Sequence, residues 1–317
     1  MVTAIIGMRF GLTNMSSELL HSLYYTHEND KEKIMISLSQ FSFPNDGSEW
    51  KFYFYNETQL HSTYYPFGVL RKYDGLTLDF APLTILYGGN GSGKTTILNV
   101  IAEKIGAERN ATYNRSSFYE EYLELCDFEI QSTLPEERKI ITSDDVFDYM
   151  LDLRALNKGI DNKREELIKK YKRAKFCGGK VNVLDEDDPI SLNYSVRGLT
   201  KAEFTNKYLG PNIREHSNGE TAIKYFYDNL KENGLYLLDE PENSLSPKRQ
   251  QELAYVLYEL VNHLGCQMII STHSPFMLAI EGALIYDLDN KAQPKKWTEL
   301  SGVRSYYNFF MEHADEF

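Results

Sequence analysis

The pattern of apolar and polar positions changes part-way along the chain. In the first 80 residues, aromatic and β-branched residues dominate two runs, 33–43 and 49–55. Such runs predict strands, and the Asp46-Gly47 pair between them favours a tight turn, so a hairpin is predicted here. Two more strands are predicted at 75–80 and 82–88, separated by Pro82. The N-terminal part is therefore expected to be rich in β-structure.

Helical spacing begins after this region. Residues 97–105 carry apolar side chains on one predicted helix face and end at Gly106, whereas 107–210 is irregular and favours helix, with one predicted strand at 139–143. Beyond residue 217, the pattern predicts helices at 220–230, 248–263 and 275–280 and strands at 235–238 and 267–271. This alternation predicts an α/β fold with a mostly parallel sheet.

Three parts follow from these patterns. We expect an N-terminal β-rich part over 1–106, a helical insertion lobe over 107–210 and a second part of the same main domain over 211–317. With 317 residues and 42% hydrophobic composition, the chain is long enough to bury a large core. The sequence contains neither internal repeats nor heptad arrays.

Composition restricts the cellular setting. No stretch approaches the roughly 18 apolar residues that span a bilayer, and the N-terminus lacks a basic segment followed by a long apolar run. We therefore expect a cytoplasmic protein without a membrane partner. Three scattered cysteines suit packing in a reducing compartment. A net charge of −12 argues against a broadly basic surface for nucleic acid.

The strongest chemical signal follows the strand at 82–88. Here GGNGSGKTT matches the phosphate-binding pattern G-x-x-x-x-G-K-[ST] between a predicted strand and a predicted helix, as the mechanism requires. Glycines let backbone amides wrap around phosphate oxygens, and the helix start adds its positive dipole end. Lys94 is expected to contact the β and γ phosphates and Thr95 to bind Mg²⁺. The predicted ATP-binding residues are Gly88, Gly89, Asn90, Gly91, Ser92, Gly93, Lys94, Thr95 and Thr96.

Two carboxylates end the apolar strand LYLLDE. Asp239 is a candidate Mg²⁺ ligand, and Glu240 is placed to orient or deprotonate an attacking water. His273 ends a third apolar strand, in MIISTHSP. Because open α/β sheets bind ligands at the carboxyl ends of their strands, it is a further catalytic candidate.

A serine-containing segment precedes the helix predicted at 220–230. Ser217 and Glu220 have the spacing of a capping box, which satisfies backbone amides at a helix start. The same spacing recurs elsewhere in the chain, for example at Thr200 and Glu203, so it does not identify a ligand site alone.

Four pieces in this order, GGNGSGKT, SNGE, LYLLDEPENSLSP and STHSP, resemble the ATP-binding cassette (ABC) ATPases, and within them the soluble SMC-like branch. The resemblance covers most of residues 64–310 and implies a P-loop ATPase head whose mostly parallel sheet is flanked by helices. It also implies an N-terminal antiparallel β lobe and a head-to-tail homodimer that traps ATP between two copies. The residues that correspond to the family's signature motif are Ser217, Asn218, Gly219 and Glu220.

The resemblance assigns further roles. Glu240 and His273 correspond to the catalytic glutamate and the histidine switch, while Asn243 and Ser246 are candidates for contacts across the dimer interface. Asp144 is a candidate contact to Mg²⁺ or water, with Gln131 as its rival. The aromatic residue that stacks on adenine stays open among Tyr65, Phe67 and Tyr73.

The output of such an ATPase is less constrained. The motifs look like those of ATPases in bacterial anti-phage defence modules of the Septu or retron type, which implies a separate effector such as a nuclease or toxin. The alternatives are a DNA-repair ATPase and a nucleotide-gated binding module with little turnover. Residues 158–180 hold nine basic and three acidic residues, which allows nucleic-acid contact but also suits a solvated helix. Asp287 and Asp289 resemble half of a nuclease metal site, and we interpret them as a strand end and turn.

Overall fold

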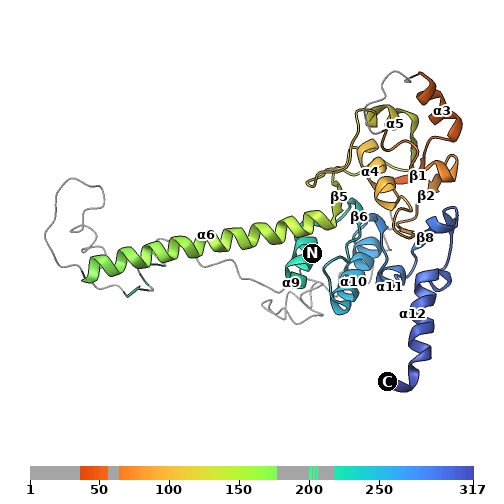
Figure 1. Cartoon of the computed structure of the whole chain (residues 1–317). Helices are drawn as coiled ribbons and strands as arrows, with labels where there is room; N and C mark the ends of the chain where they lie inside the picture. Colours follow the sequence, from red (N-terminus) through yellow and green to blue (C-terminus); the bar gives the residue numbers. More distant parts are fainter. Residues whose placement is uncertain (1–35, 56–63, 177–199, 202, 204, 206–217) are drawn as a thin grey trace. The chain divides into compact units, whose positions relative to one another are not determined.

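A computed structural model describes residues 36–55, 64–176, 200–201, 203, 205 and 218–317 (Figure 1). The chain divides into two compact units, one formed by 1–146 and 222–317 and the other by 147–221. The boundaries fall within helices α6 (Ser143–Phe176) and α9 (Asn218–Asn229). Among the described residues, no helix is both long enough and apolar enough to cross a membrane.

The first unit is organised around a six-stranded sheet with the order β5-β6-β7-β3-β8-β9. Its first five strands are parallel, and only β9 is antiparallel to its neighbour. The strands are β3 (Leu83–Tyr87), β5 (Arg138–Thr142), β6 (Leu235–Asp239), β7 (Gln267–Ser271), β8 (Leu284–Asp287) and β9 (Gln293–Pro294). This confirms the predicted α/β fold class.

Helices cover this sheet, whose central strands are mostly apolar and buried along their whole length. Every residue of β3, β6 and β7 is buried, as expected for strands that are covered on both faces. Helix α4 (Lys94–Lys104) packs against β5, β6 and β7. Helices α10 (Pro247–His263) and α11 (Pro275–Leu278) pack together, and α12 (Ser301–Glu312) follows the 3₁₀ turn η3 (Trp297–Glu299).

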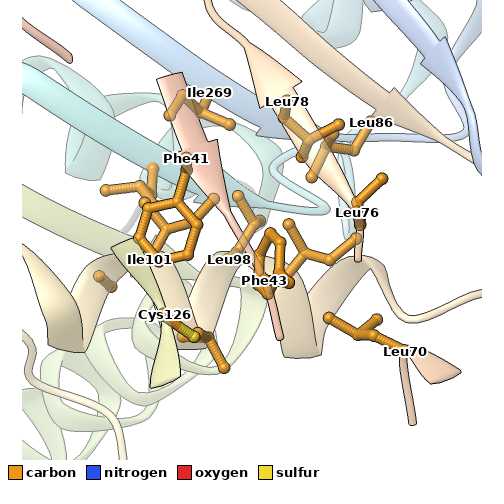
Figure 2. Close-up of a cluster of buried hydrophobic side chains, with 14 of the residues drawn as sticks. Phe41, Phe43, Leu70, Leu76, Leu78, Leu86, Leu98, Ile101, Cys126 and Ile269 are labelled. Carbon is orange, nitrogen blue, oxygen red and sulfur yellow. The ribbon is translucent and has the colours of Figure 1, made fainter. Parts of the chain in front are cut away.

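A second, antiparallel sheet has the order β2-β1-β4, from β1 (Leu38–Ser42), β2 (Thr77–Asp79) and β4 (Asp127–Ile130). Phe41 of β1 and Phe43, just after this strand, lie beside Leu98 and Ile101 of α4 in the main hydrophobic cluster (Figure 2). The same cluster includes Ile269 of β7. A shared core thus joins the N-terminal sheet to the main sheet, and the predicted antiparallel β lobe is confirmed.

The predicted hairpin over 33–55 is wrong. Residues 46–55 form helix α3 (Asp46–Tyr55), which begins where the Asn45 side-chain oxygen accepts a hydrogen bond from the Ser48 amide at 2.9 Å. An Asn at this position caps a helix start. Phe52 then stacks on Phe67 with ring centroids 4.1 Å apart. Phe52 and Tyr53 of this helix pack against the core, whereas Phe54 and Tyr55 are exposed. Strand β1 pairs with β2 and β4 instead.

The segment predicted to be irregular contains more order than its pattern indicated. It holds α5 (Tyr119–Leu125), β4 and the start of α6, and the strand predicted at 139–143 is confirmed as β5. Much of the basic stretch 158–180 lies on α6, while its last residues lie outside the described part. Cys126 and Cys266 are buried with free thiols, as packing residues should be, and Cys177 is not among the described residues.

Candidate functional site

Strand order brings the predicted site residues to one edge of the main sheet, where its parallel strands end. In register, Thr142 of β5 pairs with Asp239 of β6, and Asp239 pairs with Ser271 of β7. Ser271 in turn pairs with Leu86 of β3. Because β7 lies between β3 and β6, the loop after β7 lies between the glycine-rich loop and the carboxylate pair. Sequence order alone does not reveal this arrangement.

The phosphate loop, residues 88–95, has the backbone that its glycines predict. Gly91 and Gly93 have φ values of 78° and 101°, a region that L-residues rarely adopt. A Cβ at Gly93 would lie 2.8 Å from Leu70 Cδ2, so the end of the Leu70 side chain would have to move to admit one. The loop runs directly into α4 at Lys94, which directs the helix N-terminus to the loop.

Lys94 is the central cation of the site. Its Nζ donates to the carbonyl of Gly88 at 2.7 Å and lies 2.8 Å from His273 Nε2 and 3.9 Å from Glu240 Oε1. Burial lowers the pKa of Lys94, whereas Glu240 and three other nearby carboxylates act in the opposite direction. An amine with its charge this poorly hydrated gains from contact with an anion such as a phosphate.

Asp239 lies buried at the end of β6. Its Oδ1 accepts a hydrogen bond from the Ser271 hydroxyl, and a further hydrogen bond from Thr95 also favours the ionised form. Burial outweighs both bonds and raises the pKa of Asp239. A buried carboxylate beside a threonine hydroxyl offers the hard oxygen donors that Mg²⁺ prefers, so the residues present fit this metal.

The metal site is not complete from side chains alone. Within the described part of the chain, no group of three or more His, Cys, Asp or Glu residues is arranged to hold a metal. Mg²⁺ typically keeps waters and substrate phosphate oxygens as ligands and needs only one or two carboxylates from the protein. Thr95 and Asp239 together therefore remain a reasonable candidate pair.

Glu240 adopts an unusual backbone conformation. Its φ is 49°, in the left-handed region that costs energy for a residue with a side chain. The amide of Glu240 donates to the Ser271 carbonyl at 3.0 Å, and its Oε2 accepts from Asn243 Nδ2 at 3.0 Å. The carboxylate is about one-third exposed, at 31%. This local arrangement holds the carboxylate at the edge of the sheet, within reach of solvent.

His273 lies next to both the lysine and the glutamate. Besides its 2.8 Å contact with Lys94, its Nε2 is 3.7 Å from Glu240 Oε1. The ring is 40% exposed and makes an edge contact with Tyr87, with centroids 6.1 Å apart. The structure thus brings Lys94, Glu240 and His273 together.

A residue absent from the sequence predictions supports His273. Glu242 is 8% exposed, and its Oε1 accepts hydrogen bonds from the backbone amides of His273 at 2.6 Å and Ser274 at 3.1 Å. In the sequence, Glu242 is one more acidic residue after Asp239 and Glu240. Nothing in its spacing indicates that its carboxylate bonds to the loop after β7.

Asp289 and Tyr73 also touch the phosphate loop. Asp289 Oδ2 accepts from the Gly89 amide at 2.7 Å, while the Tyr73 hydroxyl lies 2.8 Å from the Ser92 carbonyl and 3.0 Å from that of Leu288. Burial, together with the nearby Asp289 and Asp287, raises the pKa of Tyr73. Asp287 pairs with Lys295 at 2.7 Å. The two aspartates thus belong to the end of β8 and the following turn η2 (Leu288–Asn290), as interpreted from the sequence.

The three candidates for adenine stacking have different surroundings. Phe67 is 5% exposed within the core, and the hydroxyl of Tyr73 contacts the phosphate loop. Tyr65 is half-buried, with its hydroxyl 3.2 Å from Thr96 Oγ1. Phe67 is therefore poorly placed for stacking, while Tyr65 and Tyr73 stay candidates.

Asp144, the candidate for a contact to Mg²⁺ or water, lies at the start of α6. Asp144 is exposed in the first turn of α6, immediately after β5, whereas its neighbour Asp145 is buried and accepts from the amides of Ala111 and Thr142. Gln131 follows β4 in the antiparallel sheet. Asp144 therefore remains the prediction, and Asp145 has a structural role.

The signature segment is only partly described. Ser217 lies outside the described residues, while Asn218, Gly219 and Glu220 form the first turn of α9. Of the two candidates for the dimer interface, Ser246 precedes the first residue of α10, and Asn243 bonds to Glu240. The phosphate contact predicted for this segment therefore stays a prediction.

Known proteins show matching regions. The family described as "AAA ATPase domain" matches residues 129–278, which is less than half of the chain. This region contains the carboxylate pair and His273, whereas the phosphate loop lies before it. The match supports an ATP-hydrolysing enzyme, and the prediction that the chain is an ATPase is confirmed at this level.

Individual relatives are distant. The petrobactin import ATP-binding protein YclP of Bacillus subtilis (strain 168) is 21% identical over 76% of this chain and 87% of its own length. The SMC head domain from Thermotoga maritima has 13% identity and a TM-score of 0.36, covering 80% of this chain and 94% of that one. The dimeric, post-hydrolysis ATP-binding cassette MJ0796 bound to ADP and Pi has 14% identity and a TM-score of 0.34, covering 72% and 91%.

Proposed function

We propose that the phosphate loop binds Mg²⁺·ATP and that Glu240 and His273 assist its hydrolysis. The observation that carries this proposal is the position of Lys94 Nζ, 2.8 Å from His273 Nε2 and 3.9 Å from Glu240 Oε1. A phosphate-binding cation, a base and a polar ring are thereby within reach of the same γ-phosphoryl group. Positioning and charge stabilisation of this kind supply most of the catalysis in phosphoryl transfer.

Each residue has a separate task in this reaction. Glu240 accepts a proton from water as the water oxygen bonds to the γ phosphorus, and the bond between that phosphorus and the β,γ-bridging oxygen breaks. ADP and inorganic phosphate are the products. Lys94 stabilises the charge on the phosphate oxygens, and His273 contacts the γ-phosphate.

Electrostatics supports the requirement for a divalent cation. Glu240, Asp239, Asp289 and Glu242 all act on Lys94 as negative charges, so the site without metal is acidic. A triphosphate brings further negative charge. Asp239 and Thr95 would hold Mg²⁺, with Asp144 as a further candidate, and the ion would supply the positive charge that these groups lack.

We also infer the assembly and output of the protein. The resemblance of residues 217–220 to the ABC signature supports a head-to-tail homodimer that closes on ATP. The resemblance of the segments LYLLDEPENSLSP and STHSP to those of defence-module ATPases supports, by analogy, control of a separate effector, a nuclease or toxin, in anti-phage defence.

Single-turnover hydrolysis tests the catalytic roles. We expect Glu240→Gln to slow the chemical step by about 10²- to 10⁴-fold while ATP affinity changes little, because it removes the base but keeps the shape. Lys94→Ala should instead abolish measurable ATP binding. Glu281→Gln, at an exposed glutamate, is the matched control. Hydrolysis by Glu240→Gln at the wild-type rate would contradict the role of Glu240.

A further inference from the structure

Glu242 connects the segment that contains the catalytic carboxylate to the loop that carries His273. The Glu242 Oε1 atom accepts hydrogen bonds from two successive backbone amides, those of His273 and Ser274. The Ser274 amide also lies 3.0 Å from the Thr272 hydroxyl. Hydrogen bonds from backbone amides to a carboxylate are stronger than those between neutral groups. The backbone at His273 is therefore held by one side chain from a different loop.

Stability alone is a weak explanation for this arrangement. Glu242 is 8% exposed, and its second oxygen, Oε2, is buried without a hydrogen-bond partner among the described residues. Burial of a carboxylate with one oxygen unsatisfied costs free energy that an apolar side chain would not cost. The acid therefore carries a penalty that its two amide bonds must offset.

The ring of His273 depends on its backbone for its direction. It is 40% exposed, and its polar contacts are with Lys94 and Glu240, the groups on which it would act. Glu240 is itself linked to the same turn, since its Oε2 accepts from Asn243 Nδ2. The turn 240–243 thus fixes the carboxylate directly and the histidine through Glu242.

We propose that Glu242 is a positioning residue that directs His273 towards the γ-phosphate. This proposal rests on the function proposed above. Glu242 itself touches neither Lys94 nor the reacting atoms: it acts by holding the His273 amide, so that the ring presents Nε2 beside Lys94. Its removal should impair the chemical step and leave nucleotide binding almost unchanged.

Kinetics of four variants tests this role. We expect Glu242→Ala to lower kcat by about 10- to 100-fold with ATP affinity within about threefold of wild type. Glu242→Gln retains an acceptor oxygen in the same place and should stay within about fivefold. If Glu242 acts through the histidine, adding Glu242→Ala to the His273→Ala variant should lower kcat by less than about a further twofold. Equal rate losses in both backgrounds would overturn the proposal.

A second measurement does not depend on hydrolysis. In protein labelled with ¹⁵N-histidine, the ring signals of His273 are assigned by their loss in His273→Ala, which distinguishes them from those of the other six of the seven histidines. We expect these signals to shift in Glu242→Ala and to stay near wild type in Glu242→Gln and in the exposed control Glu281→Ala. Unchanged His273 signals in folded Glu242→Ala would overturn the positioning role. Absent hydrolysis by wild type would contradict only the proposed function.

Discussion

Individual residues at this site carry buried charges and a left-handed backbone conformation, both of which cost free energy in the folded protein. Burial raises the pKa of Asp239 and lowers that of Lys94, so each charge is disfavoured by its own environment. Glu240 adds a left-handed backbone conformation with φ of 49°. Such unfavourable features cluster where function requires them. The metal and the nucleotide are the partners that would compensate for these charges.

Asp239→Asn should therefore stabilise the protein when metal and nucleotide are absent. The folded-state pKa of Asp239 is above its ordinary value of 3.8, so the folded protein binds more protons between these two values. Stability from this group falls as pH rises through that window, and above the folded pKa the full penalty is present. Asp239→Asn removes the charge and with it the cost of burying the ionised carboxylate. A gain of about 1 kcal/mol in the free energy of unfolding raises Tm by about 2–4 °C in somewhat smaller proteins.

Thermal unfolding at pH 7 in EDTA measures this effect. Wild type should gain stability when Mg²⁺ and ATP are added together, and Asp239→Asn should lose most of this gain. A lower Tm for Asp239→Asn in EDTA would show that its hydrogen bonds to Ser271 and Thr95 outweigh the burial of its charge.

At the scale of elements, side-chain hydrogen bonds determine how the two sheets join. Gln267, the first residue of β7, is 1% exposed. Its Oε1 accepts from the amides of Ser37 and Leu38, each at 2.9 Å, and its Nε2 donates to the Leu38 carbonyl at 2.7 Å. One buried amide thus satisfies backbone groups at the start of β1, the central strand of the antiparallel sheet. Each such group is costly when buried without a partner.

Gln267→Leu should destabilise the protein by about 3 kcal/mol, because it leaves buried amides and a carbonyl unpaired at about 1–3 kcal/mol each. Urea-induced unfolding gives this value directly. Gln40→Leu is the matched control, since the Gln40 side chain bonds to Asp79 at an exposed position; it should change stability by less than about 1 kcal/mol. Equal effects of the two substitutions would show that Gln267 does not join the sheets.

At the scale of the whole molecule, the proposed function requires a second copy of the chain. One helix N-terminus contributes only about 0.3–1 kcal/mol to an anion at an exposed site. Closure of the site from both sides must therefore add hydrogen bonds to the γ-phosphate. ATP, but not ADP, should supply them.

The hydrolysis-deficient variant Glu240→Gln should become dimeric with Mg²⁺·ATP and stay monomeric with ADP. Light scattering coupled to size-exclusion chromatography measures both states. Ser217→Arg in the same background should prevent dimerisation by placing a large side chain at the predicted phosphate contact. The matched change Ser305→Arg, at an exposed position on α12, should not. Dimerisation of the Ser217→Arg variant would show that Ser217 does not lie at the dimer interface.

The sequence by itself determined the phosphate loop, the two carboxylates at the end of β6 and the histidine after β7. These motifs depend on local chemistry, such as glycines where φ is positive and polar residues where apolar strands end. It also indicated the α/β class from alternating helices and strands.

Only the tertiary structure decided how these pieces meet. Placement of β7 between β3 and β6 brings His273 next to both Lys94 and Glu240, and strand order is not a local property. The helix at 46–55 was likewise decided by packing. Its aromatic residues suit either a strand or a helix, and the stacking of Phe52 on Phe67 favours the helix. Glu242 and Asp289 act on loops distant in sequence, so their roles follow only from the folded chain.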